Sequence, residues 1–186
     1  MKNINSITAI LMLIVVGLAC SDGLETKKAN EIIAEANKFI TTANENVEKA
    51  SKKYSEYIKK VDGIKNNDEV DEVRDFGKEL FPLYDSMGEN FKKASEKFDE
   101  ASKLKVNPKY KEYLETKAKE MKVRSDYAAE LKKIPQALID TKTKQEYQKE
   151  RDKINENVKK MTTEATELGD KADKIQKDNP DIIKPS

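Results

Sequence analysis

The chain has 186 residues, which fits one domain or one domain preceded by a targeting segment. Charged residues make up 38 % of it, and because 36 basic side chains nearly balance 35 acidic ones, it lacks the basic excess expected of a nucleic-acid-binding protein. It contains no histidine and a single cysteine, which excludes a Ser-His-Asp site, a Cys-His site and an intrachain disulfide.

The first predicted element is a secretion signal at residues 1–19. Its n-region carries Lys2, and the apolar run from Ile7 to Ala19 has 13 residues. A helix that crosses a bilayer needs about 20 apolar residues, so this run is too short to span. A basic n-region, a short apolar stretch and a small residue at its end are typical of a signal peptide.

The end of this signal, Leu18-Ala19-Cys20, resembles the lipobox of bacterial lipoproteins. The resemblance implies cleavage between Ala19 and Cys20, a diacylglyceryl thioether on Cys20 and acylation of the new N-terminus, so that a covalent lipid anchors the chain to a membrane. Ser21 follows the cysteine, and in enterobacterial lipoproteins the absence of Asp at this position favours the outer membrane over the inner membrane. The sequence does not distinguish the periplasmic side from the cell surface.

Residues 20–25 are predicted to form the lipidated cysteine and a short tether, residues 26–178 a helical bundle domain, and residues 179–186 an irregular tail. From Thr26 to Val61 the apolar residues repeat every seven positions, the period of helices that pack as in a coiled coil. One row of the repeat consists of Ala29, Ala36, Ala43, Ala50 and Tyr57. The other row consists of Ile33, Ile40, Val47, Tyr54 and Val61. The alanine row predicts close approach of a helix that carries larger side chains.

A second long helix is predicted from about Glu69 to Leu104. Gly63 suits the end of the preceding helix, and Asp68 suits the N-cap of this one. Pro82 lies inside the predicted helix and indicates a kink, because proline removes a backbone donor.

The third helix is predicted to start at Asn107 and Pro108, as N-cap and first helical residue. We expect it to end or bend at Pro135, since the residue before a proline avoids the helical region. A fourth helix follows Thr143 and Glu146, whose spacing matches a capping box.

The predicted fold is therefore all-α: an elongated antiparallel up-down bundle of three to four long helices with coiled-coil-like packing. Short loops favour this arrangement, because they make helices that follow each other antiparallel. An extended coiled coil that dimerises is the alternative architecture, which the tight turns disfavour.

Three similar stretches, "ENVEKAS", "ENFKKAS" and "ENVKKMT", begin at Glu45, Glu89 and Glu156. Each places its apolar residues on the same two seam positions, so we interpret them as markers of helix register rather than as a binding motif. Duplication of a helical unit and shared heptad chemistry both explain the likeness.

The polar side chains give no catalytic, cofactor-binding or metal site. Most acids alternate with lysines at helical spacing, as on solvated faces, and the acids at Asp71, Glu72 and Asp75 favour the dipole of the helix they open. The seven tyrosines fall largely on the seams, which indicates core packing. A cluster of them at one end of the bundle is the alternative, as the lining of a ligand groove.

These features predict a non-enzymatic, membrane-anchored protein of the bacterial cell envelope that serves as a helical scaffold or protein-binding module. Its expected partners are the membrane, through the lipid on Cys20, and another envelope protein, with no nucleic acid; a homo-oligomer is also compatible with the sequence.

Two other functions stay open. One is a surface-exposed host-binding or antigenic lipoprotein, because the composition is similar to that of helical surface lipoproteins of spirochaetes; only "SDGLET" separates Cys20 from the first helix, which argues against surface display. The other is a carrier that holds a small ligand in a cavity between helices, near Gly77 and Pro82.

Overall fold

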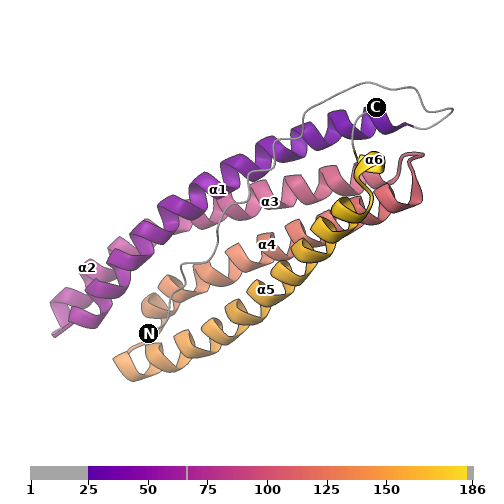
Figure 1. Ribbon diagram of the computed structural model, residues 1–186. Coiled ribbons are helices and arrows are strands. Elements are labelled where there is room, and N and C mark those ends of the chain that lie inside the picture. Colours follow the sequence, from indigo (N-terminus) through magenta and orange to yellow (C-terminus); the bar gives the residue numbers. More distant parts are fainter. Residues whose placement is uncertain (1–24, 66, 184–186) are drawn as a thin grey trace.

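The computed structural model describes residues 25–65 and 67–183, and nearly all of them are helical (Figure 1). The helices are α1 (Thr26–Gly63), α2 (Asn67–Lys78), α3 (Phe81–Ser102), α4 (Pro108–Asp140), α5 (Lys144–Asp178) and α6 (Pro180–Ile183). No strand occurs within these two ranges. The predicted all-α class is confirmed.

Four long helices lie side by side in an elongated antiparallel bundle (Figure 1). Helix α3 packs against α1 on one side and α4 on the other, and α5 packs against α4, whereas the backbones of α1 and α5 stay apart. Helix α1 alone has 38 residues, or about 57 Å. The up-down topology is confirmed, and the side of the bundle between α1 and α5 is left open.

Local sequence signals set several helix ends. The Asn107 side chain accepts a hydrogen bond from the Lys109 N–H at the start of α4. At the start of α5, Thr143 and Glu146 form the predicted capping box: the Thr143 hydroxyl accepts from the Glu146 N–H and the Glu146 carboxylate from the Thr143 N–H, each at 3.2 Å. Both caps satisfy backbone donors that a helix start leaves unpaired.

The helix predicted from Glu69 to Leu104, with a kink near Pro82, is instead two helices, and the interruption lies just before Pro82. The chain breaks at Glu79 and Leu80, between α2 and α3. Pro82 then lies in the first turn of α3, where its missing N–H costs no helical hydrogen bond. Leu80 is fully buried at the break and anchors it in the core.

Two further boundaries differ from the sequence-based expectation. Helix α2 begins at Asn67, so Asp68 lies inside the helix rather than at its N-cap. Pro180–Ile183 forms one helical turn, α6, where the tail was expected to be irregular. The turn contacts α4 as well as α5, which supports a helical conformation at this point.

The third helix was predicted to end or bend at Pro135, and it does not end there, because α4 continues to Asp140. Pro135 is fully buried and packs against Gly77 of α2: a Cβ atom on Gly77 would lie 3.2 Å from the Pro135 Cβ and 3.0 Å from the Tyr57 ring. The glycine lets the backbone of α2 approach this closely. Packing against α2 thus offsets the hydrogen bond that proline removes.

Arginine Arg74 of α2 holds the last turn of α4. Its guanidinium donates to the backbone carbonyls of Leu138 and Thr141, each at 3.1 Å. These carbonyls have no partner within the helix, and a cation at a helix C-terminus also complements the helix dipole.

The two rows of the α1 repeat are buried to different extents. Ala29, Ala36 and Ala43 of the alanine row are fully buried, and α3, the neighbour of α1, buries large residues such as Phe91 and Phe98. In the other row Ile33 and Val61 are buried. Its central members are only partly buried: Ile40, Val47 and Tyr54. The reason is that α5 does not pack directly against this part of α1.

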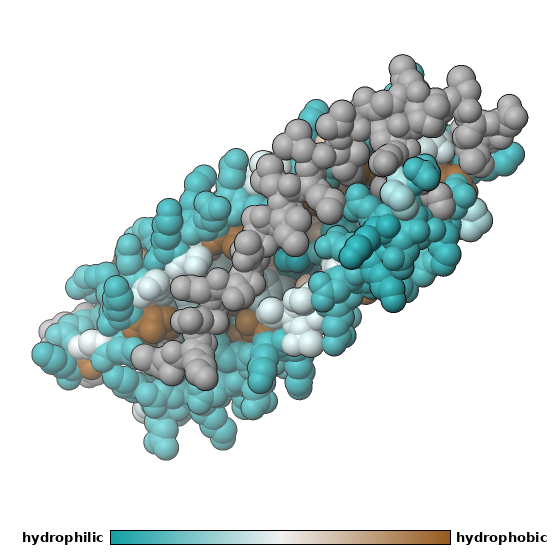
Figure 2. All heavy atoms as spheres, viewed as in Figure 1, coloured by the Kyte–Doolittle hydropathy of each residue, from teal (hydrophilic) through white to brown (hydrophobic). Residues whose placement is uncertain are grey.

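The face of the molecule shown in Figure 2 is mostly hydrophilic, with small apolar patches between the hydrophilic side chains. Among the helices in the described part of the chain, none combines the length and the apolar character that a membrane span needs.

Candidate functional site

The predicted lipid site, Ala19 and Cys20, lies outside the described residues. Glu25 is the first residue described, and it pairs with Lys105 in the loop between α3 and α4. The Glu25 N–H donates to the Lys105 carbonyl at 2.7 Å, and the Glu25 carboxylate accepts from the Lys105 N–H at 3.0 Å. The start of α1 is therefore fixed at the end of the bundle where α4 begins and α5 ends (Figure 1).

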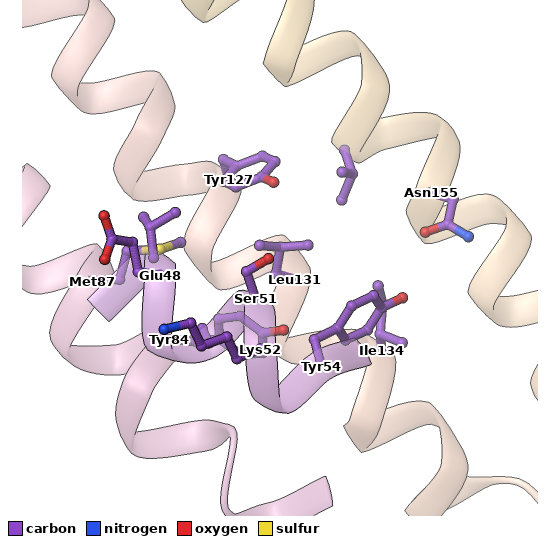
Figure 3. A pocket seen from close by; sticks show the side chains of 13 residues that line it. Glu48, Ser51, Lys52, Tyr54, Tyr84, Met87, Tyr127, Leu131, Ile134 and Asn155 are labelled. Carbon is purple, nitrogen blue, oxygen red and sulfur yellow. The ribbon is translucent and has the colours of Figure 1, made fainter. Parts of the chain in front are cut away.

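A cavity of about 310 Å³ lies in the middle of the bundle and is lined by α1, α3, α4 and α5 (Figure 3). Its apolar wall consists of Val47, Met87, Leu131, Ile134 and Val158. The cavity exists because α1 and α5 stay apart at this level, so the partly buried row of α1 faces open space. It does not lie beside Gly77, where Tyr57 and Pro135 fill the space.

Three tyrosines from three helices reach this cavity: Tyr54 of α1, Tyr84 of α3 and Tyr127 of α4 (Figure 3). Burial raises the pKa of each phenol, so all three stay neutral near neutral pH. None of their hydroxyls makes a hydrogen bond to another described residue. Their hydroxyls can act as hydrogen-bond donors. Tyr84 is 3 % exposed, as expected for core packing, and the three tyrosines meet in the middle of the bundle rather than at one end.

The polar rim of the cavity carries Glu48, Ser51 and Lys52 from α1 and Asn155 from α5. All four are exposed. Neither Glu48 nor Lys52 forms an ion pair with a residue that the structure describes. The rim therefore offers both signs of charge to a molecule that enters.

A cluster of unpaired polar groups lies between α1 and α5 next to this cavity; we call Tyr57, Tyr147 and Arg151 the tyrosine–arginine cluster. Both tyrosines are fully buried, and neither hydroxyl makes a hydrogen bond; the Arg151 Nε is buried and also lacks a hydrogen-bond partner. The guanidinium carbon of Arg151 lies 5.6 Å from the centre of the Tyr147 ring. Buried polar groups are rarely left unpaired, so this cluster needs an explanation.

Burial raises the pKa of both tyrosines in the cluster. For Tyr57 the neighbouring Tyr147 adds to the rise of the pKa, whereas for Tyr147 the Tyr57 hydroxyl and then Arg151 oppose the rise. The two hydroxyls lie close enough to shift each other's pKa as hydrogen-bonding neighbours, although their contact falls short of hydrogen-bond geometry. Both groups are neutral donors near neutral pH.

Two buried carboxylates elsewhere in the bundle are fully paired. Glu120 accepts from Lys117 at 2.6 Å and from Arg124 at 2.8 Å, all within α4. Burial raises the pKa of Glu130, but hydrogen bonds from Lys133 and Asn157 outweigh it and leave the pKa below its ordinary value. Neither carboxylate is free to act as a base, and the described residues hold no group of three or more side chains suited to a metal ion.

The acids near the start of α2 are also paired. Asp71 pairs with Arg74, Asp75 with Lys78, and Glu72 with Lys60 of α1. These are exposed ion pairs, so they stabilise the helix surface only slightly.

The three similar stretches have a structural role that the sequence shows only in part. Their seam positions agree with the predicted register, since Phe91 is buried and Val47 and Val158 are half-buried. The asparagines beside the seam do more than expected. Asn46 donates to the Ser86 hydroxyl of α3 at 3.0 Å, and Asn157 donates to the Glu130 carboxylate of α4 at 2.9 Å.

The sequence gives no signal for the tyrosine–arginine cluster. Arg151 and Asn155 read as polar members of a solvated helix face, and Tyr147 as one seam residue among several. Their relation to Tyr54 and Tyr57 depends on how far α5 stands from α1, which no local pattern encodes.

No protein-family model, no curated protein and no solved structure matches the chain.

Proposed function

We propose that the chain is a lipid-anchored, non-enzymatic protein of the bacterial cell envelope whose helical rod serves as a scaffold for another envelope protein. The observation that carries this proposal is the pairing of Glu25 with Lys105, only five residues after the lipobox cysteine Cys20.

Five residues reach about 17 Å at most when fully extended. A lipid on Cys20 would therefore hold the bundle close to the membrane by one defined end, formed by the start of α1, the loop between α3 and α4, and the end of α5. The opposite end, with the turns after α1 and α4, would point away by the length of α1. Such an arrangement suits a spacer or docking rod, because it presents long charged faces at a fixed distance from the bilayer.

The anchor is tested by expressing the full-length chain in bacteria and separating the lysate with a nonionic detergent that forms its own phase. We expect the wild-type protein in the detergent phase and the Cys20→Ala variant in the aqueous phase, because acyl chains on Cys20 drive the partition. Ser21→Ala is the matched control and should behave as wild type. An unchanged partition of Cys20→Ala would contradict the anchor.

The same cells also test the alternative function, that of a surface-exposed host-binding or antigenic lipoprotein. Loss of the protein when intact cells are treated with protease would favour surface display, whereas protection would favour a periplasmic scaffold.

The cavity favours a second candidate function, the binding of a small apolar ligand. Its volume of about 310 Å³ is within the range of small-molecule sites. It is about twice the roughly 150 Å³ of a cavity that holds one benzene ring, which corresponds to an alkyl chain of about ten to twelve carbon atoms.

This second function predicts that the purified protein binds decanol, as measured by titration calorimetry. Val47→Trp should abolish binding, because the indole ring would occupy the space that Val47 leaves open. Val70→Trp places the same side chain at a half-buried valine of α2 that does not line the cavity, and it should bind normally. Equal binding by both variants would show that decanol sits elsewhere.

A further inference from the structure

The cavity between the helices has a buried floor and an exposed mouth. Its floor consists of the four lining residues that are buried: Ala50, Tyr84, Met87 and Ile134. The polar rim described above is exposed and forms the mouth. Among these four floor residues, Tyr84 alone carries a hydroxyl, so one hydrogen-bond donor lies on an otherwise apolar surface.

The Tyr84 hydroxyl is unpaired but open to the cavity. Tyr84 is 3 % exposed, and its hydroxyl makes no hydrogen bond to another described residue. The hydroxyls of Tyr57 and Tyr147 are sealed inside the bundle, whereas the Tyr84 oxygen keeps some accessible surface. Because Tyr84 lines the cavity, a molecule that fills the cavity can contact this oxygen (Figure 3).

Two further phenols lie close to Tyr84. Burial is the main cause that raises the pKa of Tyr84, and Tyr54 and Tyr127 add to the rise, which places the three phenols near one another. All three line the cavity, and each comes from a different helix (Figure 3). Near neutral pH they are protonated and uncharged, so each has a proton to donate.

The surroundings of the floor favour an uncharged ligand that accepts a hydrogen bond. A ligand that displaces water from the Tyr84 hydroxyl loses affinity unless it replaces the hydrogen bond that the water made. Of the described residues that line the cavity, only Glu48 and Lys52 are charged, and both lie at the exposed mouth. A charged group at the floor would lose its hydration without gaining a buried partner, which is strongly unfavourable.

We propose that the cavity binds an uncharged carbonyl compound, whose oxygen accepts a hydrogen bond from Tyr84 while its hydrocarbon part packs against Val47, Leu131 and Val158. The proposal rests on the ligand-binding function above and adds the class of ligand. A carbonyl accepts the bond that Tyr84 offers and brings no donor that the apolar floor would leave unpaired. A molecule of about ten carbon atoms fits the volume.

The test compares three ligands of similar size by titration calorimetry on the purified protein near neutral pH: butylbenzene, butyrophenone and 4-phenylbutyrate. Butyrophenone has a carbonyl where butylbenzene has a methylene, and 4-phenylbutyrate carries a carboxylate. We expect Tyr84→Phe to weaken the binding of butyrophenone about three- to tenfold, as loss of one hydrogen bond does, and not to weaken that of butylbenzene. Wild type should bind butyrophenone more tightly than 4-phenylbutyrate.

Tyr113→Phe is the matched control, because it removes the hydroxyl of a buried tyrosine of α4 that does not line the cavity. It should bind all three ligands as wild type does. If Tyr84→Phe does not fold, NMR of butyrophenone with an isotope-labelled carbonyl carbon gives the readout in wild type. A carbonyl shift like that in an alcohol supports the hydrogen bond, and a shift like that in an alkane overturns it.

Each other outcome overturns a defined part. Failure of wild type to bind either butylbenzene or butyrophenone would overturn the ligand-binding function itself. Butyrophenone binding that is unchanged in Tyr84→Phe would overturn the role of Tyr84 and leave the apolar cavity function standing. Tighter binding of 4-phenylbutyrate than of butyrophenone would overturn the uncharged class of ligand.

Discussion

Buried tyrosine hydroxyls in this bundle fall into two groups. The Tyr110 hydroxyl donates to the Asn30 side-chain oxygen, in a buried pair that joins α4 to α1. The hydroxyls of Tyr57 and Tyr147 have no partner, although both rings are fully buried. The same side chain therefore stabilises the bundle fully at one site and only through its ring at the other two.

This contrast predicts opposite effects of removing the hydroxyl. In the protein without ligand, Tyr57→Phe should raise the free energy of unfolding by about 1 kcal/mol, because it removes an unpaired buried polar group. Tyr110→Phe should lower it by about 1–2 kcal/mol, because the buried oxygen of Asn30 then lacks its donor. Urea unfolding followed by circular dichroism measures both. If Tyr57→Phe destabilises as much as Tyr110→Phe, the Tyr57 hydroxyl has a partner in the native protein.

At the scale of the elements, the sequence predicts those features that depend on residues near one another in the chain. The caps at Asn107 and Thr143 need only a side chain and an N–H two or three residues away, and both are found where the spacing places them. The seven-residue repeat likewise predicts which faces of α1 are apolar. Such signals work because their partners are fixed by helical geometry alone.

Features that depend on a second helix are not predicted. Pro135 indicates the end or a bend of a helix until Gly77 of α2 is known to pack against it. Tyr54 reads as an ordinary seam residue until α5 is known to stay apart from α1. The candidate ligand site arises from this second feature, since it joins residues of α1 and α5 that are about a hundred positions apart in the chain, such as Tyr54 and Asn155.

For the whole molecule, the buried tyrosines link stability to alkaline pH. Burial raises the pKa of all seven tyrosines of the chain. In the unfolded chain they ionise near pH 10, whereas in the folded chain they hold their protons to higher pH. The unfolded state thus binds fewer protons above about pH 10, so the free energy of unfolding is unaffected below this pH and falls above it.

We therefore expect the bundle to unfold cooperatively on alkaline titration. Each tyrosine lowers the free energy of unfolding by up to about 1.4 kcal/mol per pH unit once the unfolded chain has ionised. The raised pKa values of Lys97 and Lys103, caused by hydrogen bonds from their ammonium groups to neighbouring carboxylates, act in the same direction, because these ion pairs are also lost as pH rises. Tyrosinate absorbance and circular dichroism should change together over one transition.

A titration in urea serves as the control, where tyrosinate should form near pH 10 without a cooperative step. The titration also bears on the ligand site, because Tyr54 and Tyr127 line a cavity that opens to solvent and are only partly buried. If tyrosinate absorbance in the native protein rose near pH 10 while the helices stayed intact, most of the tyrosines would be accessible to water. The packed core around Tyr57, Tyr84 and Tyr110 would then be contradicted, and with it the cavity between the helices that ligand binding requires.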